Sequence, residues 1–143
     1  MAAQLDEVLS TAALNGTERR VVERIVGRLR EEIGGDLLAV WLYGSRARGE
    51  ADPAETDPDL RSDVDLLAIV NDSRDAGELK WWAQPMVEAE GDAEGDSPVY
   101  YSLRIFDAGW LRGRRRIDSF FIQEVDRDKL VLAGGDLEGE EYR

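Results

Sequence analysis

The chain has 143 residues, a formal net charge of −13, and neither cysteine nor histidine. Disulfides, thiolate zinc sites and a histidine general base are therefore excluded, and any chemistry must rest on carboxylates, hydroxyls and arginines. The excess of acidic residues argues against a broad surface for extended nucleic acid, because such binding depends on neutralising phosphates. The length predicts one domain over residues 1–135, followed by an acidic tail over residues 136–143 that we expect to be mobile.

The first part of the chain is expected to be helical. Residues 1–14 predict a short helix, and apolar residues then recur from Val21 to Ile33 at the spacing of one helical stripe, which Gly34 ends. Thr17 is the predicted N-cap of this second helix, because its hydroxyl can accept from amides of the first turn. The N-terminus lacks a basic start followed by an apolar stretch and the apolar runs are short, so we expect a cytoplasmic protein with no membrane contact.

The middle of the chain predicts a buried sheet. Leu37–Tyr43 and Val64–Val70 are continuous apolar runs of strand length, typical of strands that are covered on both faces. A helical stripe follows over residues 79–87, where Pro85 is expected to divide the helix in two. Val99–Phe106 is rich in aromatic and branched residues and predicts a third strand.

The last third predicts a short helical turn at residues 107–111, a helix over residues 117–125 and a short strand at residues 129–132. The side chains expected to face inward from the second of these elements are Phe120, Phe121 and Val125. Strands that alternate with helices indicate the α/β (α+β) class, with a small mixed sheet flanked by helices. Arg112–Arg116 is a basic cluster that we interpret either as a solvated loop or as a contact for an acidic partner or for phosphates.

Two carboxylates stand at the start of the second apolar strand. Asp63 and Asp65 flank Val64, so the strand period of two places both acids on one face. At about 4 Å and an effective dielectric of about 20, their repulsion is roughly 4 kcal/mol, and a hard cation would relieve it. Oxygen ligands of this kind suit Mg²⁺. Gly44 and Ser45 follow the first strand and could form a turn that approaches a phosphate closely.

These residues resemble the nucleotidyltransferase superfamily that includes DNA polymerase β, and most closely its minimal nucleotidyltransferase branch. The match is carried by residues 44–49, GSRARG, and residues 62–67, SDVDLL. The resemblance implies the polymerase β-like fold, with Gly44 and Ser45 on the β and γ phosphates of a nucleotide and with Asp63 and Asp65 on Mg²⁺. Arg48 occupies the recurrent arginine position of the family, where it would touch phosphate or support the loop.

The chain departs from the family pattern in two places. The acidic segment 50–61 makes the interval between the two motifs longer than in compact members. The family also places a third carboxylate on a neighbouring strand, and residues 99–106 contain none. Asp96, just before that strand, is the predicted third acid, and Asp107, just after it, is the alternative.

The resemblance implies Mg²⁺-dependent transfer of a nucleoside monophosphate, most plausibly AMP from ATP, to a hydroxyl of a macromolecular acceptor. Stand-alone members are commonly antitoxins that silence a HEPN-type toxin by adenylylating a tyrosine, so the expected partners are ATP or another nucleoside triphosphate and such a toxin. Two alternatives stay open: a regulatory or binding subunit that has lost the transfer step, and an antibiotic nucleotidyltransferase. A homo-oligomer is also left open.

Overall fold

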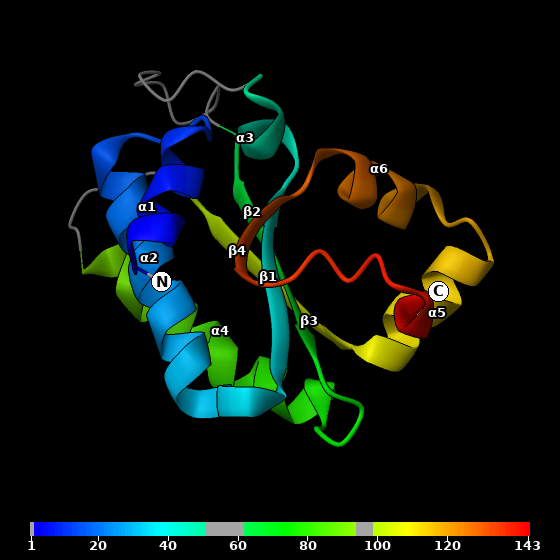
Figure 1. Ribbon diagram of the computed structural model, residues 1–143. Helices are drawn as coiled ribbons and strands as arrows, with labels where there is room; N and C mark the ends of the chain where they lie inside the picture. Colours follow the sequence, from blue (N-terminus) through cyan, green and yellow to red (C-terminus); the bar gives the residue numbers. More distant parts are fainter. Residues whose placement is uncertain (1, 51–61, 94–98) are drawn as a thin grey trace.

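The computed structural model describes residues 2–50, 62–93 and 99–143 (Figure 1). Four strands form one sheet in the order β3-β2-β1-β4, in which β1 is antiparallel to both β2 and β4, and β2 is parallel to β3. The strands are β1 (Leu37–Tyr43), β2 (Val64–Val70), β3 (Tyr101–Asp107) and β4 (Leu130–Gly134). The predicted mixed α/β class is confirmed, as are the bounds of the first two strands.

Helices cover both faces of the sheet, which explains why β1 and β2 are apolar throughout (Figure 1). The first layer consists of α1 (Ala2–Ser10), α2 (Gly16–Ile33) and α4 (Ala76–Asp92). The second layer consists of α5 (Ala108–Arg116) and α6 (Phe120–Asp128). Alternate side chains of β1 divide between the layers, with Leu42 in the first core and Trp41 in the second.

The second helix begins two residues earlier than the sequence suggests. Its N-cap is Asn15, whose side chain accepts from the Glu18 amide at 2.8 Å, while the Glu18 carboxylate accepts from the Asn15 amide at 2.9 Å. The prediction of Thr17 is therefore wrong, because this reciprocal capping box satisfies two backbone donors at once.

Pro85 does not divide α4, which is continuous from Ala76 to Asp92. The proline removes the one hydrogen bond that would reach the carbonyl of Trp81, and the Trp81 side chain is 85% exposed. Water can satisfy that carbonyl, so the helix continues past the proline.

Two predictions about the last third also need correction. The arginine cluster lies in α5 rather than in a loop. Phe120 is 86% exposed, whereas Phe121 packs against the second core and Val125 is buried. Because α6 begins only at Phe120, the inward face of this helix passes through Phe121 and Val125.

The end of the chain lies against the second layer, close to α5 (Figure 1). The Trp41 indole donates to the Gly135 carbonyl at 2.9 Å, Leu137 is buried, and Arg115 donates to the carbonyl oxygens of Leu137 and Tyr142. The expected mobility of residues 136–143 stays a prediction. In the part of the chain that the structure describes, no helix is both long and apolar enough to cross a membrane.

Candidate functional site

The acid pair lies where β2 begins, beside the end of β1. Asp65 is the register partner of Tyr43, the last residue of β1, and its side chain faces the second layer of helices together with Leu67. Asp63 is exposed and Asp65 is half-buried. Asp63 precedes β2 and has no register partner, so the expectation that both acids share the face next to the Gly44 turn stays a prediction.

Glycine is the residue type that fits position 44, in the turn between β1 and the helix that follows it. Its backbone has φ 79° and ψ −160°, and a Cβ built on it would lie 2.7 Å from the Oδ2 atom of Asp65. Any other side chain would suffer both backbone strain and a clash with the carboxylate. The absence of a side chain thus lets the Asp65 carboxylate lie directly against the turn that opens α3 (Ser45–Arg48).

Arg46 fixes the turn to the strand that carries the acids. Its side chain is buried, and the guanidinium donates to Glu18 at 2.8 Å, to the Ala13 carbonyl at 2.9 Å, and to both the hydroxyl and the carbonyl of Ser62 at 3.0 Å. Ser62 directly precedes Asp63. Arg46 is therefore a positioning residue and not the solvated helix charge that its sequence context allows.

A hollow of about 320 Å³ opens beside Asp65. It is lined by residues of β1, α3, β2 and α6, namely Tyr43, Gly44, Ser45, Arg48, Asp65, Phe121, Glu124 and Val125. The structure thus brings the predicted residues Gly44, Ser45, Arg48 and Asp65 into one cavity. Amide, hydroxyl, guanidinium and carboxylate groups meet there, a combination that suits a phosphorylated ligand.

Arg48 already has partners at the rim of this hollow. Its guanidinium pairs with Glu50 at 3.0 Å and approaches the carboxylate of Asp128, at the end of α6, at 3.7 Å. Both contacts are partly exposed, so they cost little to exchange for a phosphate.

Glu124 is the lining residue that sequence reasoning missed. It precedes the inward-facing Val125 and lies one helical turn after Phe121, which placed it at the edge of the buried stripe of α6. That signal was readable in the sequence, but nothing in the sequence shows that this stripe lies against the end of β1.

Both burial and neighbouring charges change the pKa of the Asp65 carboxyl. Removal from water raises the pKa of the Asp65 carboxyl above its ordinary value, the neighbouring Asp63 adds to this, and the positive charge of Arg104 opposes it. Burial, together with Asp65, also raises the pKa of Tyr43 to about 12, so the phenol stays protonated.

The third strand contributes no acid to this face. Ser102 is the register partner of Asp65, and Arg104 is that of Leu67. Asp107 pairs instead with Val70 at the far end of the strand, where its carboxylate accepts from an amide of α5. The alternative of Asp107 as third acid is therefore wrong.

The preferred third acid, Asp96, lies outside the described residues. Within the described ranges, no three histidine, cysteine or acidic side chains come close enough together to hold a metal ion. Asp63 and Asp65 supply oxygen donors only, and this donor chemistry fits Mg²⁺ completed by substrate phosphates.

No protein-family model and no curated protein matches the chain. Among solved structures, the chain is similar to a candidate nucleotidyltransferase from Sulfolobus solfataricus, with 16% identity over 91% of this chain and 83% of that one, at a TM-score of 0.45. It is also similar to a toxin–antitoxin crystallised with AMP-PNP, with 18% identity over 84% and 79% and a TM-score of 0.45. A mutant of the toxin–antitoxin MntA–HpeT gives 16% identity over 84% and 79%, at a TM-score of 0.44.

Proposed function

We propose that the chain is a nucleotidyltransferase that moves AMP from ATP to a hydroxyl group of a macromolecular acceptor. The observation that carries this proposal is the contact between the Gly44 turn and Asp65, where a Cβ on the glycine would lie 2.7 Å from the carboxylate. The Gly44 turn and the half-buried Asp65 line the same hollow. A glycine turn allows a phosphate to approach the backbone closely, and a carboxylate beside it could hold the metal ion that accompanies a nucleoside triphosphate.

The proposed phosphate contacts are Gly44, Ser45 and Arg48. The Gly44 backbone would approach a phosphate closely, the Ser45 hydroxyl would donate to it, and the Arg48 guanidinium would exchange its partly exposed carboxylates for a phosphate oxygen. Phe121 and Val125 of α6, which line the same hollow, would restrict water around the reacting group.

Asp63 and Asp65 would hold Mg²⁺ together with the triphosphate. When bound, the ion would neutralise the negative charge that develops on the phosphates and on the departing pyrophosphate. Burial and the neighbouring Asp63 raise the pKa of Asp65, and a bound cation would offset both effects by favouring the carboxylate form. Arg46 holds the start of β2 in place through Ser62 and so fixes where both acids point.

A carboxylate is also required to receive the proton of the acceptor hydroxyl. Asp96 remains the proposed third acid on the strength of the resemblance. Of the described residues that line the hollow, Glu124 and Asp65 are the carboxylates, so Glu124 is the alternative in this role.

The acceptor in this proposal is a protein, with a HEPN-type toxin as the specific candidate. Support comes from an exposed apolar side chain on a helix that lines the hollow. Phe120, the first residue of α6, is 86% exposed and directly precedes Phe121, which lines the hollow. Large exposed apolar groups at the rim of a site are typical of a surface that another protein covers.

One observation favours a second candidate, a binding or regulatory subunit without the transfer step. Arg104 stands on the third strand, on the face that presents Asp65, and opposes the negative charge there. This arrangement keeps an anion site while weakening the proton acceptor that transfer needs.

Thermal unfolding with each nucleoside triphosphate, with and without Mg²⁺, tests the proposal. Wild type should gain about 2.7 kcal/mol at a ligand concentration of a hundred times Kd, whereas the Asp63→Asn, Asp65→Asn double variant should gain nothing. Label from [α-³²P]ATP should then appear on an acceptor protein only with the wild-type chain. Binding without label transfer to any acceptor would favour the regulatory subunit, and absence of any shift would refute the nucleotide site.

A further inference from the structure

Three aromatic rings, from β3, α5 and α6, contact one another on the face of the sheet that is covered by the second layer of helices. The Phe106 and Trp110 rings are stacked with their centres 3.7 Å apart, and the Trp110 and Phe121 rings meet edge to face at 6.3 Å. Phe121 also lines the hollow beside Asp65. The rings therefore form a continuous row that ends at the proposed nucleotide site.

Each of these rings carries a cationic side chain, and we call the whole set the cation–aromatic surface. It consists of Lys80 over Phe106, Arg104 over Phe121 and Arg114 over Trp110, at 4.5, 5.4 and 5.7 Å from cation to ring centre. All three cationic side chains are exposed, and none forms an ion pair with an acid in the described ranges. On a chain of net charge −13, three neighbouring positive charges are thus left for a ligand.

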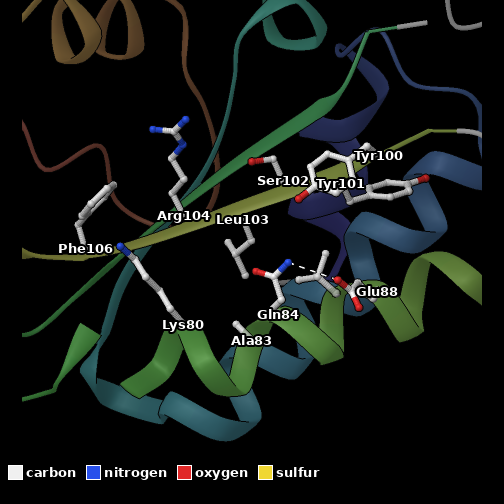
Figure 2. A pocket seen from close by; sticks show the side chains of 11 residues that line it. Lys80, Ala83, Gln84, Glu88, Tyr100, Tyr101, Ser102, Leu103, Arg104 and Phe106 are labelled. Atoms are coloured by element: carbon white, nitrogen blue, oxygen red, sulfur yellow. Dashed lines mark hydrogen bonds between the residues drawn. The ribbon is translucent and has the colours of Figure 1, made fainter. Parts of the chain in front are cut away.

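Arg104 connects the cation–aromatic surface to the acid pair. The side chains of Arg104 and Leu103 leave β3 on opposite sides, and Leu103 points toward α4 and the cavity of about 300 Å³ between that helix and β3 (Figure 2). Arg104 is the register partner of Leu67, so it shares the face of Asp65. Because Asp65 is half-buried and Arg104 is exposed, an approaching anion meets the guanidinium first.

A contact with a ring holds a cation in place without using its hydrogen-bond donors. A guanidinium or ammonium group over a ring keeps N–H groups free for an acceptor. A charge-assisted hydrogen bond to a carboxylate is the stronger interaction, and the aromatic support reduces the side-chain freedom that is lost when it forms. The cation–aromatic surface is therefore prearranged for anionic groups.

The rings themselves indicate which kind of anion fits. Each ring already has a cation and at least one other ring against it, so the surface presents charge rather than an open ring on which a nucleobase could stack. Three cations suit a few carboxylates, whereas the overall charge of −13 opposes a long polyanion. A second copy of the chain is a poor occupant for the same reason.

We propose that the cation–aromatic surface binds an acidic segment of a partner protein, with carboxylates of the segment on Lys80, Arg104 and Arg114. The complementary charge fixes the segment beside the hollow, because Phe121 belongs to both. On the basis of the function proposed above, this segment belongs to the acceptor and flanks the hydroxyl that receives AMP. The surface would thus select acceptors whose hydroxyl residue has acidic neighbours.

Binding of synthetic peptides to the full chain tests the surface without nucleotide. The probe is a fluorescent peptide of about nine residues with one tyrosine among glutamates, and its counterpart has glutamine in place of every glutamate. The glutamate peptide should bind at least tenfold more tightly, and its affinity should fall as NaCl rises from about 50 mM to about 500 mM. It should shift the indole signal of Trp110 in NMR spectra and not that of the buried Trp41. Equal affinity for the two peptides would overturn the proposal.

Two double variants that remove the same charge locate the binding. Arg104→Gln with Arg114→Gln should weaken the glutamate peptide at least tenfold. Arg30→Gln with Arg116→Gln should weaken it less than twofold, because Arg30 lies on α2 in the other layer and Arg116 lies two residues from Arg114, on another side of α5. All four side chains are exposed, so the thermal midpoints should stay close to that of wild type. Equal losses in the two double variants would mean unspecific attraction and would overturn the proposal.

Further outcomes separate this inference from the proposed function. Peptide binding that needs Arg104 and Arg114, in a chain whose thermal midpoint no nucleoside triphosphate shifts, would support the surface and refute the nucleotide site. A nucleotide shift without peptide binding would do the reverse. Tighter binding of single-stranded oligouridylate than of the glutamate peptide, lost in the Arg104→Gln, Arg114→Gln variant, would overturn the acidic segment in favour of RNA. Label from [α-³²P]ATP on the tyrosine of the glutamate peptide, and not on that of its glutamine counterpart, would support the selection of acceptors.

Discussion

Arg46 and Glu18 form an ion pair with an N–O distance of 2.8 Å, and each side chain is 1% exposed. The same Glu18 carboxylate accepts from the Asn15 amide in the capping box of α2, and the same guanidinium holds Ser62 ahead of Asp63. One buried network therefore joins the start of α2, the turn after β1 and the acid pair. Its groups are extensively hydrogen-bonded, as a buried ion pair requires.

Removal of one partner from this pair should be costly. Arg46→Met leaves the Glu18 carboxylate buried without its cation, and we expect the free energy of unfolding to fall by about 3–5 kcal/mol in urea titrations. The double variant Glu18→Gln, Arg46→Met should recover part of that loss, because no uncompensated charge remains. A double variant no more stable than Arg46→Met would show that the pair does not act as a unit.

Gly44 and Gly49 both have a positive φ, and comparing an alanine at each position distinguishes backbone strain from a clash of the new Cβ with a neighbouring atom. Gly44→Ala should lower the free energy of unfolding by about 3 kcal/mol, because alanine is strained there and its Cβ would meet Asp65. Gly49 has φ 74° but nothing within 4 Å of a built Cβ, so Gly49→Ala should cost only about 1 kcal/mol. Gly44→Ala alone should also abolish the thermal shift with Mg²⁺ and ATP. Equal losses of stability in the two variants would argue against the tight contact with the carboxylate.

The raised pKa of Asp65 predicts a specific dependence on pH. The folded state holds this proton more tightly than the unfolded state, so the carboxyl costs stability as pH rises from its ordinary pKa of 3.8 through its raised pKa. Without metal, Asp65→Asn should be more stable than wild type at pH 7, and the difference should vanish at pH 3. Urea unfolding at both pH values, with Mg²⁺ removed by chelator, measures this. An Asn variant less stable than wild type at pH 7 would contradict the prediction.

The burial of Leu137 predicts that the end of the chain contributes to stability. Leu137→Ala should lower the free energy of unfolding by about 2 kcal/mol, because this side chain packs in the second core. Phe120→Ala, at a side chain that is 86% exposed, should change it by less than about 0.5 kcal/mol. If residues 136–143 were mobile, as the sequence suggests, Leu137→Ala would be as silent as Phe120→Ala.

The first two strands and the position of Asp65 were predictable because each depends on a short-range pattern. Leu37–Tyr43 and Val64–Val70 are buried on both faces, and a run that is apolar throughout has this simple signature. The period of two along a strand placed Asp65 on the face of Leu67 and Ile69 without any knowledge of tertiary structure.

The remainder of the site depends on contacts between distant segments. An arginine in GSRARG gives no sign that Arg46 is buried, because its partners Ala13 and Glu18 belong to another part of the chain. Arg104 could be read as an exposed strand residue, but its position beside the acid face follows from the parallel register of β2 and β3. Glu124 enters the site only because α6 packs across the end of β1.

The side chain of Trp41 is covered by segments that are made late in the synthesis of the chain. Trp41 is covered by α5, α6 and the segment after β4, and its indole donates to Gly135. All of these leave the ribosome after β1, β2 and β3 have been made. The apolar face that carries Asp65 therefore stays uncovered on the nascent chain until α5, α6 and Leu137 have left the ribosome, and this uncovered face is the one that a chaperone or an early-arriving partner would meet.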